Sequence, residues 1–343
     1  METDKFTSVI VPSKRKTLLQ SCLASLKKQT YPADMFEVIA ISPEKYIEEN
    51  SSSIVIRNIV DSKANQAEAR NIAEKSANGE ILAFCDDDCI LPPNWINNGV
   101  QHFSNGDVAT VGGPSNPPLE NVSSRELLSG LLMMSFLGTG SHRKAYTAAS
   151  ETKPRLCRPV EIICANMFVD RNKFREVGGF DGIVPQEEDR LNTKFIKKGY
   201  KVLYDPNCFN IHYQRPYGFR FIRNMFWLMA GQGSLAMSRL SPSSIYYLIP
   251  SAFVVGLIVG PFLFFIPHVE FLYILGLIVY AFSVFLESGR LTLMLKIQKR
   301  SKFLAFLTLP FVLLIHHIVA GIGFIFGFFR QLLHGIRLRL GGK

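Results

Sequence analysis

The N-terminal part of the chain alternates short apolar runs with segments whose apolar residues follow a helical repeat. The runs are rich in Val and Ile and stop at Pro, Ser or Asp, which is typical of strands that end in turns. Strands that alternate with helices predict an α/β fold with a mostly parallel, doubly wound, Rossmann-like sheet. The expected strands are residues 7–11, 36–41, 54–60 and 81–85, and the expected helices lie at about 18–26 and 66–76.

The pattern is less regular further along the chain. Residues 108–111 and 202–206 are expected to be further strands. An acidic start at Glu187, followed by an apolar face and then by Gly199, indicates a helix. Residues 127–136 are apolar but too short to cross a bilayer. They form either a helix of the core or a helix that rests on the membrane surface.

The C-terminal part of the chain is largely apolar, which predicts a membrane segment. We therefore divide the chain into a catalytic domain at 1–240 and a membrane segment at 241–343. An amphipathic helix at about 216–238 would lie at the membrane interface. Three segments are each long enough to cross about 30 Å of hydrocarbon, namely residues 245–267, 271–289 and 303–329.

Two details of this membrane segment bear on its packing and topology. The spacing Gly256-x-x-x-Gly260 permits close approach of helices. Pro310 and His316-His317 leave open whether the third apolar segment is one span or a hairpin. The basic loop 296–302 is expected on the cytoplasmic side.

Charge and cysteine usage restrict the partners and the compartment. The 343 residues carry a net charge of +10, and the basic clusters at 296–302 and 330–343 favour anionic membrane lipids. No zinc-finger spacing or aromatic RNA-binding motif is present, so nucleic acid is not an expected partner. The six cysteines form no zinc motif and fit buried thiols in a reducing compartment. Because the N-terminus lacks an apolar signal segment, we expect a multi-pass protein of the cell membrane with a cytoplasmic catalytic domain.

Three adjacent carboxylates, Asp86 to Asp88, follow the fourth expected strand. Ligands bind at the carboxyl ends of the strands in such sheets, where Ser13, Ser42 and Asp61 would also lie. Adjacent carboxylates repel one another unless a cation or a donor-rich partner neutralises them. Oxygen ligands favour Mg²⁺ or Mn²⁺. A solvated acidic turn is the alternative, but the preceding strand favours a site for a metal ion and a diphosphate.

A second acidic cluster, Glu187-Glu188-Asp189, begins the later helix. Compensation of the helix dipole would explain this cluster if it stood alone. Transfer of a group from a metal-bound diphosphate, however, needs a base for the acceptor proton and a metal ion for the charge that grows on the departing diphosphate. The two clusters together would supply both functions.

Five short motifs occur in order within about residues 6–215. They are Val9-Ile10-Val11-Pro12-Ser13, Ala69-Arg70-Asn71, Phe84-Cys85-Asp86-Asp87-Asp88, Gly178-Gly179-Phe180-Asp181 and Glu188-Asp189. This order resembles glycosyltransferase family 2, the inverting enzymes of the GT-A fold, and is most similar to its succinoglycan-biosynthesis-type subgroup. One departure is Ile41-Ser42-Pro43-Glu44, because the family usually has an acidic turn there.

The resemblance implies roles for individual residues. Asp88 would be the metal ligand, with His212 completing the metal shell, and Asp189 would be the catalytic base beside Glu188. His212 could equally be a structural histidine, and Arg70 could be a surface residue of its helix, paired with Glu74. The nucleotide-sugar side would comprise Pro12, Ser13, Arg15, Asp61, Arg70, Asp86 and Asp87, and the acceptor or phosphate side would comprise Gln214, Arg215, Arg223 and Trp227.

These observations predict a membrane-bound, metal-dependent, inverting hexosyltransferase. It would move a sugar from a UDP- or GDP-sugar to a lipid-linked or membrane-bound acceptor in polysaccharide or glycan assembly. A polyprenyl-phosphate sugar synthase is a second enzymatic interpretation. A processive synthase is disfavoured because the Gln-x-x-Arg-Trp signature is absent. A catalytically inactive membrane scaffold or nucleotide-sugar sensor is the alternative from another functional class.

Overall fold

The chain divides into two compact units, which differ from the single boundary expected at residue 240. Residues 1–118 and 141–213 make the first unit, whereas residues 119–140 join residues 214–343 in the second. The inserted segment 119–140 therefore belongs with the C-terminal helices, although it lies between two parts of the first unit in sequence. The computed structural model describes residues 5–47, 54–104, 106–148, 151–182, 186–238, 244–266 and 268–340.

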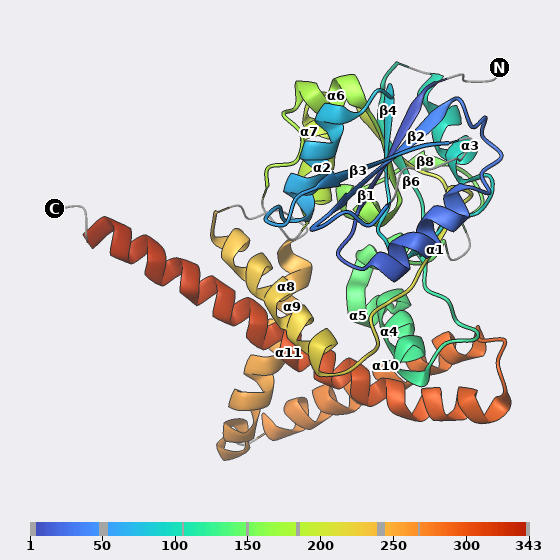
Figure 1. Cartoon of the computed structure of the whole chain (residues 1–343). Helices are drawn as coiled ribbons and strands as arrows, with labels where there is room; N and C mark the ends of the chain where they lie inside the picture. The colour runs from blue at the N-terminus through green and yellow to red at the C-terminus, as the bar shows by residue number, and fades with distance from the viewer. Residues whose placement is uncertain are drawn as a thin grey trace. The chain divides into compact units, whose positions relative to one another are not determined.

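The first unit is built on an eight-stranded sheet with the order β3-β2-β1-β4-β9-β6-β10-β8 (Figure 1). Six of these strands run in one direction, and β8 and β9 run in the other. The mostly parallel sheet expected from the sequence is confirmed. The strands are β1 Thr7–Pro12, β2 Phe36–Ser42, β3 Val55–Val60, β4 Ile81–Phe84, β6 Val108–Gly112, β8 Arg155–Leu156, β9 Met167–Asp170 and β10 Lys201–Tyr204.

The antiparallel strand β9 was not identified from the sequence. It lies between β4 and β6, and its Met167, Phe168 and Val169 are completely buried. A strand that is buried on both faces has no alternation of apolar and polar residues, so its pattern reveals neither the strand nor its direction.

Helices cover both faces of this sheet (Figure 1). Side chains that alternate along a strand supply both cores: Val9 and Val11 belong to one, and Ile10 to the other. On the first face lie α1 (Lys16–Leu26) and α3 (Trp95–Val100), and on the second lie α2 (Gln66–Ser76), α6 (Arg171–Glu176) and α7 (Glu187–Lys197).

The C-terminal ends of the parallel strands meet at one edge of the sheet. Backbone hydrogen bonds join Ser13 N to Ile41 O at 2.7 Å, Asp61 N to Ser42 O at 2.9 Å and Cys85 N to Ile10 O at 3.3 Å. A small second sheet with the order β5-β11-β7 adds to the unit. Its strands are β5 Cys89–Ile90, β7 Ser115–Asn116 and β11 Asn210–His212, and the short 3₁₀ helices are η1 Gln101–Ser104, η2 Gly140–Ala145, η3 Pro159–Glu161 and η4 Cys164–Asn166.

The second unit is helical. Three of its helices are long and apolar enough to cross a membrane, at Leu248–Phe265, Glu270–Leu293 and Lys299–Leu333. The third apolar segment is one continuous helix through Pro310, so it does not form a hairpin. The helices are α4 Ser124–Met134, α5 Phe136–Thr139, α8 Phe219–Ser238, α9 Ser244–Val259 with the 3₁₀ turn η5 Gly260–Phe265, α10 Glu270–Leu293 and α11 Lys299–Leu340.

Polar side chains of α10 and α11 hold the short helix α5. Glu287 Oε1 accepts hydrogen bonds from Phe136 N at 2.6 Å and from Ser135 Oγ at 3.0 Å. At the other end of α5, His316 Nε2 lies 2.9 Å from Gly138 O and His317 Nε2 lies 2.8 Å from Leu137 O. Polar groups within apolar helices need such partners, because a hydrocarbon environment offers none. These bonds explain why the apolar segment 119–140 belongs to the second unit.

The closest helix contact of this unit uses glycines of α11 rather than the expected Gly256-x-x-x-Gly260. A Cβ added at Gly327 would overlap Ala230 O of α8, and one added at Gly323 would meet Phe226 O. Ser234 Oγ also donates to Gly327 O at 3.0 Å. Gly260 does contact the Tyr273 ring, but no neighbouring atom among the described residues lies within 4 Å of a Cβ added at Gly256. Small residues let helix backbones approach one another.

We expect Gly327→Val to destabilise the second unit by roughly 1–3 kcal/mol, because the added atoms force α8 and α11 apart. Thermal unfolding of the full chain in detergent measures this loss. Gly276→Val in α10 is the matched control, since the described part of the chain places nothing within 4 Å of its Cβ. Equal unfolding temperatures for the two variants would contradict the close contact.

Candidate active site

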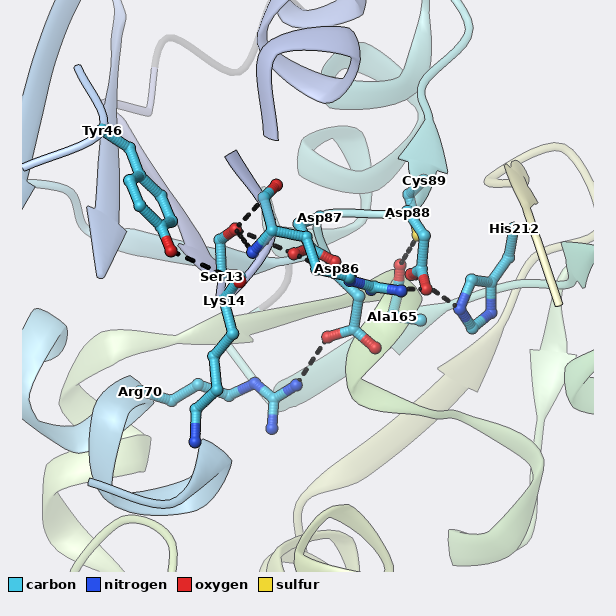
Figure 2. A network of polar contacts seen from close by, with 11 residues as sticks. Ser13, Lys14, Tyr46, Arg70, Asp86, Asp87, Asp88, Cys89, Ala165 and His212 are labelled. Atoms are coloured by element: carbon cyan, nitrogen blue, oxygen red, sulfur yellow. Dashed lines mark hydrogen bonds and ion pairs between the residues drawn. The ribbon is translucent and has the colours of Figure 1, made fainter. Parts of the chain in front are cut away.

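The acidic triplet lies at the edge of the sheet, directly after β4. Asp87 is buried, with 4% of its surface exposed. It accepts a hydrogen bond from Ser13 Oγ at 2.8 Å (Figure 2). A second hydrogen bond comes from Arg15 Nε at 3.3 Å. Burial raises the pKa of Asp87, and the hydrogen bonds from Arg15 and Ser13 offset part of this rise. The loop after β1 is therefore tied to the acidic triplet, a pairing that the sequence did not predict.

The small sheet brings His212 to Asp88. Its register places His212 opposite Cys89, and the Tyr213 amide donates to Asp88 O at 3.0 Å. His212 Nε2 then lies 3.0 Å from Asp88 Oδ1, while an Arg15 guanidinium nitrogen lies 2.7 Å from Asp88 Oδ2. The two candidate metal ligands thus lie within hydrogen-bonding distance of each other.

Electrostatics make Asp88 a strong anion. Burial alone would raise the pKa of Asp88, but His212 and Arg15 hold it well below its usual range. Burial would likewise lower the pKa of His212, but the hydrogen bond and the charge of Asp88 raise it. The two residues therefore stabilise each other in a largely buried place.

The donor atoms at this place fit a divalent cation. One ligand atom each from Asp88, Cys89 and His212 lies within 4.8 Å of the others. Asp88 Oδ1 is buried and lies 3.0 Å from His212 Nε2. A carboxylate and an imidazole suit Mn²⁺, and a carboxylate with water suits Mg²⁺. The residues present thus match the metal ion expected from the sequence.

Arg70 does not lie on the surface of α2. Its side chain is 1% exposed and its guanidinium joins two carboxylates, Asp86 Oδ1 at 2.8 Å and Glu187 Oε1 at 2.9 Å. The alternative pairing with Glu74 is wrong, because Glu74 pairs with Arg171 and Arg175. The ion pair with Glu187 was not predicted, since a separation of 117 residues leaves no local pattern.

The carboxylates that begin α7 differ in their surroundings. Glu188 Oε2 lies 3.9 Å from Cys164 Sγ. Burial, together with the charge of Glu187, raises the pKa of Glu188 to about 8, and Arg70 acts in the opposite direction. Burial raises the pKa of Asp189 to about 6, which the charge of Arg190 limits. Cys164, Glu187 and Glu188 also come close enough to bind a metal ion, but Glu187 is already paired with the guanidinium of Arg70.

Asp61 and Ser42 organise the loops at the same edge. Asp61 Oδ1 accepts from Lys63 N at 2.9 Å and Ala64 N at 2.8 Å, which lowers the pKa of the exposed Asp61. Ser42 Oγ donates to Glu44 O at 2.7 Å and accepts from Asn58 Nδ2 at 2.8 Å. Both side chains thus build turns where the sequence expected contacts to a nucleotide.

The sequence analysis did not identify Asn58 and Tyr46, which lie beside these turns. Asn58 Oδ1 accepts from the Tyr46 amide at 2.8 Å, and Tyr46 Oη donates to Lys14 O at 3.3 Å (Figure 2). This loop takes the place of the family's usual acidic turn. No residue in it has a sequence signal that would have identified the arrangement.

The four residues expected on the acceptor side belong to the second unit. Arg215 and Arg223 are exposed, and Gln214 is half-buried. Trp227 is 51% exposed, and its ring lies 6.0 Å from that of Phe326. The remaining nucleotide-side residue, Pro12, is the last residue of β1.

Comparison with known proteins identifies the first part of the chain. Residues 8–152 match the family described as "Glycosyl transferase family 2". The chain contains a family 2 glycosyltransferase domain. The motifs around Ser13, Arg70 and Asp86 to Asp88 all lie within this domain, whereas Glu188, Asp189 and His212 lie beyond its matched range.

Relatives of the family 2 domain extend over more of the chain. The glycosyltransferase AglE of Haloferax volcanii is 24% identical over 240 residues, which cover 66% of this chain and 73% of that protein. A Methanococcus voltae protein is 20% identical over 353 residues, which cover 96% of this chain and 98% of that protein. Its name is dolichyl N-acetyl-alpha-D-glucosaminyl phosphate 3-beta-D-2,3-diacetamido-2,3-dideoxy-beta-D-glucuronosyltransferase.

A solved structure shares the architecture. The mannosyltransferase PcManGT from Pyrobaculum calidifontis, in complex with GDP-Man and Mn²⁺, aligns with a TM-score of 0.56 at 17% identity. The alignment covers 91% of this chain and 86% of that protein. Together with the mostly parallel sheet, this likeness confirms the expected GT-A fold.

We expect His212→Ala to weaken Mn²⁺ binding by at least about 10-fold, because it removes a neutral nitrogen ligand. Titration calorimetry with Mn²⁺ in the presence of UDP or GDP measures the affinity. His102→Ala is the matched control, since His102 Nε2 pairs with Asp205 at 2.7 Å in the same unit. An unchanged Mn²⁺ affinity in the His212 variant would make this histidine structural.

Proposed function

We propose that this protein is a membrane-bound, inverting glycosyltransferase that moves a sugar from a nucleotide-sugar to a lipid-linked acceptor. The observation that carries the proposal is the pair of carboxylate clusters that Arg70 joins within one unit. The earlier cluster pairs Asp88 with His212 at 3.0 Å, and the later one contains Glu188, whose pKa is raised. Two acidic groups with different environments can divide metal binding and proton transfer between them.

The donor side would be formed by the edge of the sheet. Asp86 has 22% of its side chain exposed beside Arg70 and would accept a hydrogen bond from the ribose. Arg15 is held by Asp87 and Asp88 and would supply positive charge to the diphosphate. Asp88 and His212 would hold Mg²⁺ or Mn²⁺, which when bound supplies charge neutralisation for the departing diphosphate.

The acceptor hydroxyl would be activated by a carboxylate of α7. Its proton passes to the carboxylate as the oxygen bonds to the anomeric carbon, and the bond from that carbon to the diphosphate breaks. Attack from the face opposite the diphosphate inverts the anomeric centre and requires one base without a covalent nucleophile. The contacts favour Glu188, which neighbours Arg70 and Cys164, over Asp189, the base expected from the sequence.

The helical unit supports a membrane-bound acceptor. Three helices are long and apolar enough to cross a membrane, and the Methanococcus voltae relative acts, by its name, on a dolichyl-phosphate-linked sugar. The mannosyltransferase neighbour holds GDP-Man. We therefore propose a UDP- or GDP-sugar as the donor and a lipid-linked sugar as the acceptor, with the catalytic unit on the cytoplasmic side of the cell membrane.

A panel assay tests the proposal as a whole. The purified full chain in lipid is given UDP- and GDP-sugars with Mg²⁺ or Mn²⁺, and mass spectrometry follows cleavage of each donor. Lipid extracts with and without polyprenyl-phosphate then reveal the acceptor. Transfer to a lipid-linked sugar supports the proposal, transfer to the bare lipid phosphate indicates a polyprenyl-phosphate sugar synthase, and a protein that cleaves no donor would contradict an enzymatic function.

We expect Glu188→Gln to lower kcat by about 10²–10⁴-fold, the usual contribution of a general base, while leaving nucleotide affinity nearly unchanged. Since the base acts in its deprotonated form, kcat/KM of the wild type should fall as the pH drops below about 8, the pKa of Glu188. Initial rates with the identified donor, recorded from about pH 5 to about pH 9, measure both effects.

Asp189→Asn is the matched control for this experiment, because it neutralises the adjacent carboxylate of the same helix turn. The acidic limb would instead lie near pH 6, the pKa of Asp189, if that residue were the base. Loss of transfer in the Asp189 variant, together with full activity of the Glu188 variant, would therefore return the role to Asp189.

A further inference from the structure

Arg70 is a buried cation whose position has consequences beyond charge balance. Its side chain is 1% exposed and its ionised form must be paired, since an isolated buried charge is costly. The pairing uses both terminal nitrogens of the guanidinium: Nη2 donates to Asp86 and Nη1 donates to Glu187. The guanidinium is planar and rigid, so one group fixes the two carboxylates relative to each other.

These two carboxylates come from elements that have different tasks in the proposed reaction. Asp86 follows β4 and opens the acidic triplet, which also contains Asp88. Glu187 is the first residue of α7 and directly precedes Glu188. Arg70 itself lies in α2, whose N-terminus is fixed by a capping box of Asn65 and Glu68. The capped helix α2 thus places the guanidinium of Arg70 between Asp86 and Glu187.

The start of α7 depends on contacts from α2. Gln186 precedes the helix in a left-handed conformation with φ 66°, which costs of order 1–3 kcal/mol and persists only where the surroundings enforce it. Asn71 Nδ2 donates to Phe180 O at 2.8 Å, and Asn65 Nδ2 donates to Gly182 O at 3.0 Å. The ion pair of Arg70 with Glu187 adds a charged contact at the helix start itself.

We propose that Arg70 is a positioning residue that links the donor-binding carboxylate Asp86 to the first turn of α7, so that an occupied nucleotide site holds Glu188 in its place. This inference rests on the proposed function for the identity of the reaction, but the link itself concerns only the nucleotide site and α7. It differs from the contact with the nucleotide base that the sequence suggested for Arg70.

The charges around Glu188 give the link a second signature. Glu187 and Asp189 of α7 raise its pKa, Arg70 of α2 lowers it, and Cys164 lies 3.9 Å away. Removing the positive charge of Arg70 therefore raises the pKa of Glu188 further. A residue that only stabilised the fold would leave the pH profile of the remaining active enzyme unchanged.

Two substitutions separate geometry from charge. Arg70→Lys keeps the charge but replaces the two-pronged group with a point charge, so we expect kcat to fall about 10–100-fold with less than about a threefold change in KM for the donor. The acidic limb of kcat/KM should stay in place. Arg70→Met also loses the charge, so its limb should move to higher pH.

Hydrogen exchange of the full chain tests the link without any assay of transfer. Mn²⁺ with UDP or GDP is added, and exchange of the amides in residues 187–197 is followed. We expect the nucleotide to slow this exchange in the wild type and to have much less effect in Arg70→Lys. Arg171→Lys is the matched control, because it alters a largely buried ion pair with Glu74 in the same unit.

The outcomes separate the link from the proposed function. If the wild type binds neither UDP nor GDP, the proposed function is contradicted. Nucleotide binding with unchanged exchange in residues 187–197 overturns the link alone. So does a variant whose nucleotide affinity falls with kcat unchanged, since that result assigns Arg70 to the nucleotide itself. Equal losses of kcat in the Arg70 and Arg171 variants, with unshifted pH profiles, would reduce Arg70 to a structural residue.

Discussion

Negative charge concentrated at one edge of the sheet is the constraint on which the catalytic unit depends. Two acidic clusters, Asp86 to Asp88 and Glu187 to Asp189, lie in largely buried surroundings. Buried carboxylates repel one another and lose hydration, so they require cations or protons. Arg15 and Arg70 provide cations, and His212 pairs with Asp88. The raised pKa of Glu188 indicates that a proton serves where these partners do not suffice.

The same constraint explains how the neighbouring loops are arranged. The loop after β1 bends so that Ser13 and Arg15 reach Asp87. The small sheet pairs β5 with β11 and thereby carries His212 to Asp88. Both of these elements contribute a hydrogen-bond donor or a positive charge to the acidic triplet. This composition supports the proposed binding of a ligand that combines a cation with phosphate groups.

The helical unit is subject to a different constraint, because its polar groups are few and need partners among apolar side chains. Glu287 accepts a hydrogen bond from the Phe136 amide, and His316 and His317 contact the carbonyl oxygens of α5. Glycines of α11 let α8 approach so closely that backbone meets backbone. Internal hydrogen bonds and close packing thus satisfy the few polar groups of these apolar helices.

The sequence by itself determined the local features of this protein. The strands β1 to β4, the helix α2 and the three apolar segments follow from the periodicity and composition of neighbouring residues, which act over a few turns. The ordered motifs also indicated the family 2 domain that the comparison found. These signals need no knowledge of distant contacts.

Only the tertiary structure decided which charges meet. Arg70 and Glu187 are 117 residues apart, and Asp87 and Ser13 are 74 apart, so no local pattern could have paired them. The sequence likewise did not predict the direction of β9, or that residues 119–140 belong to the helical unit. An apolar run predicts that a segment will be buried, but it does not identify the segment that will cover it. The covering segments come from distant parts of the chain.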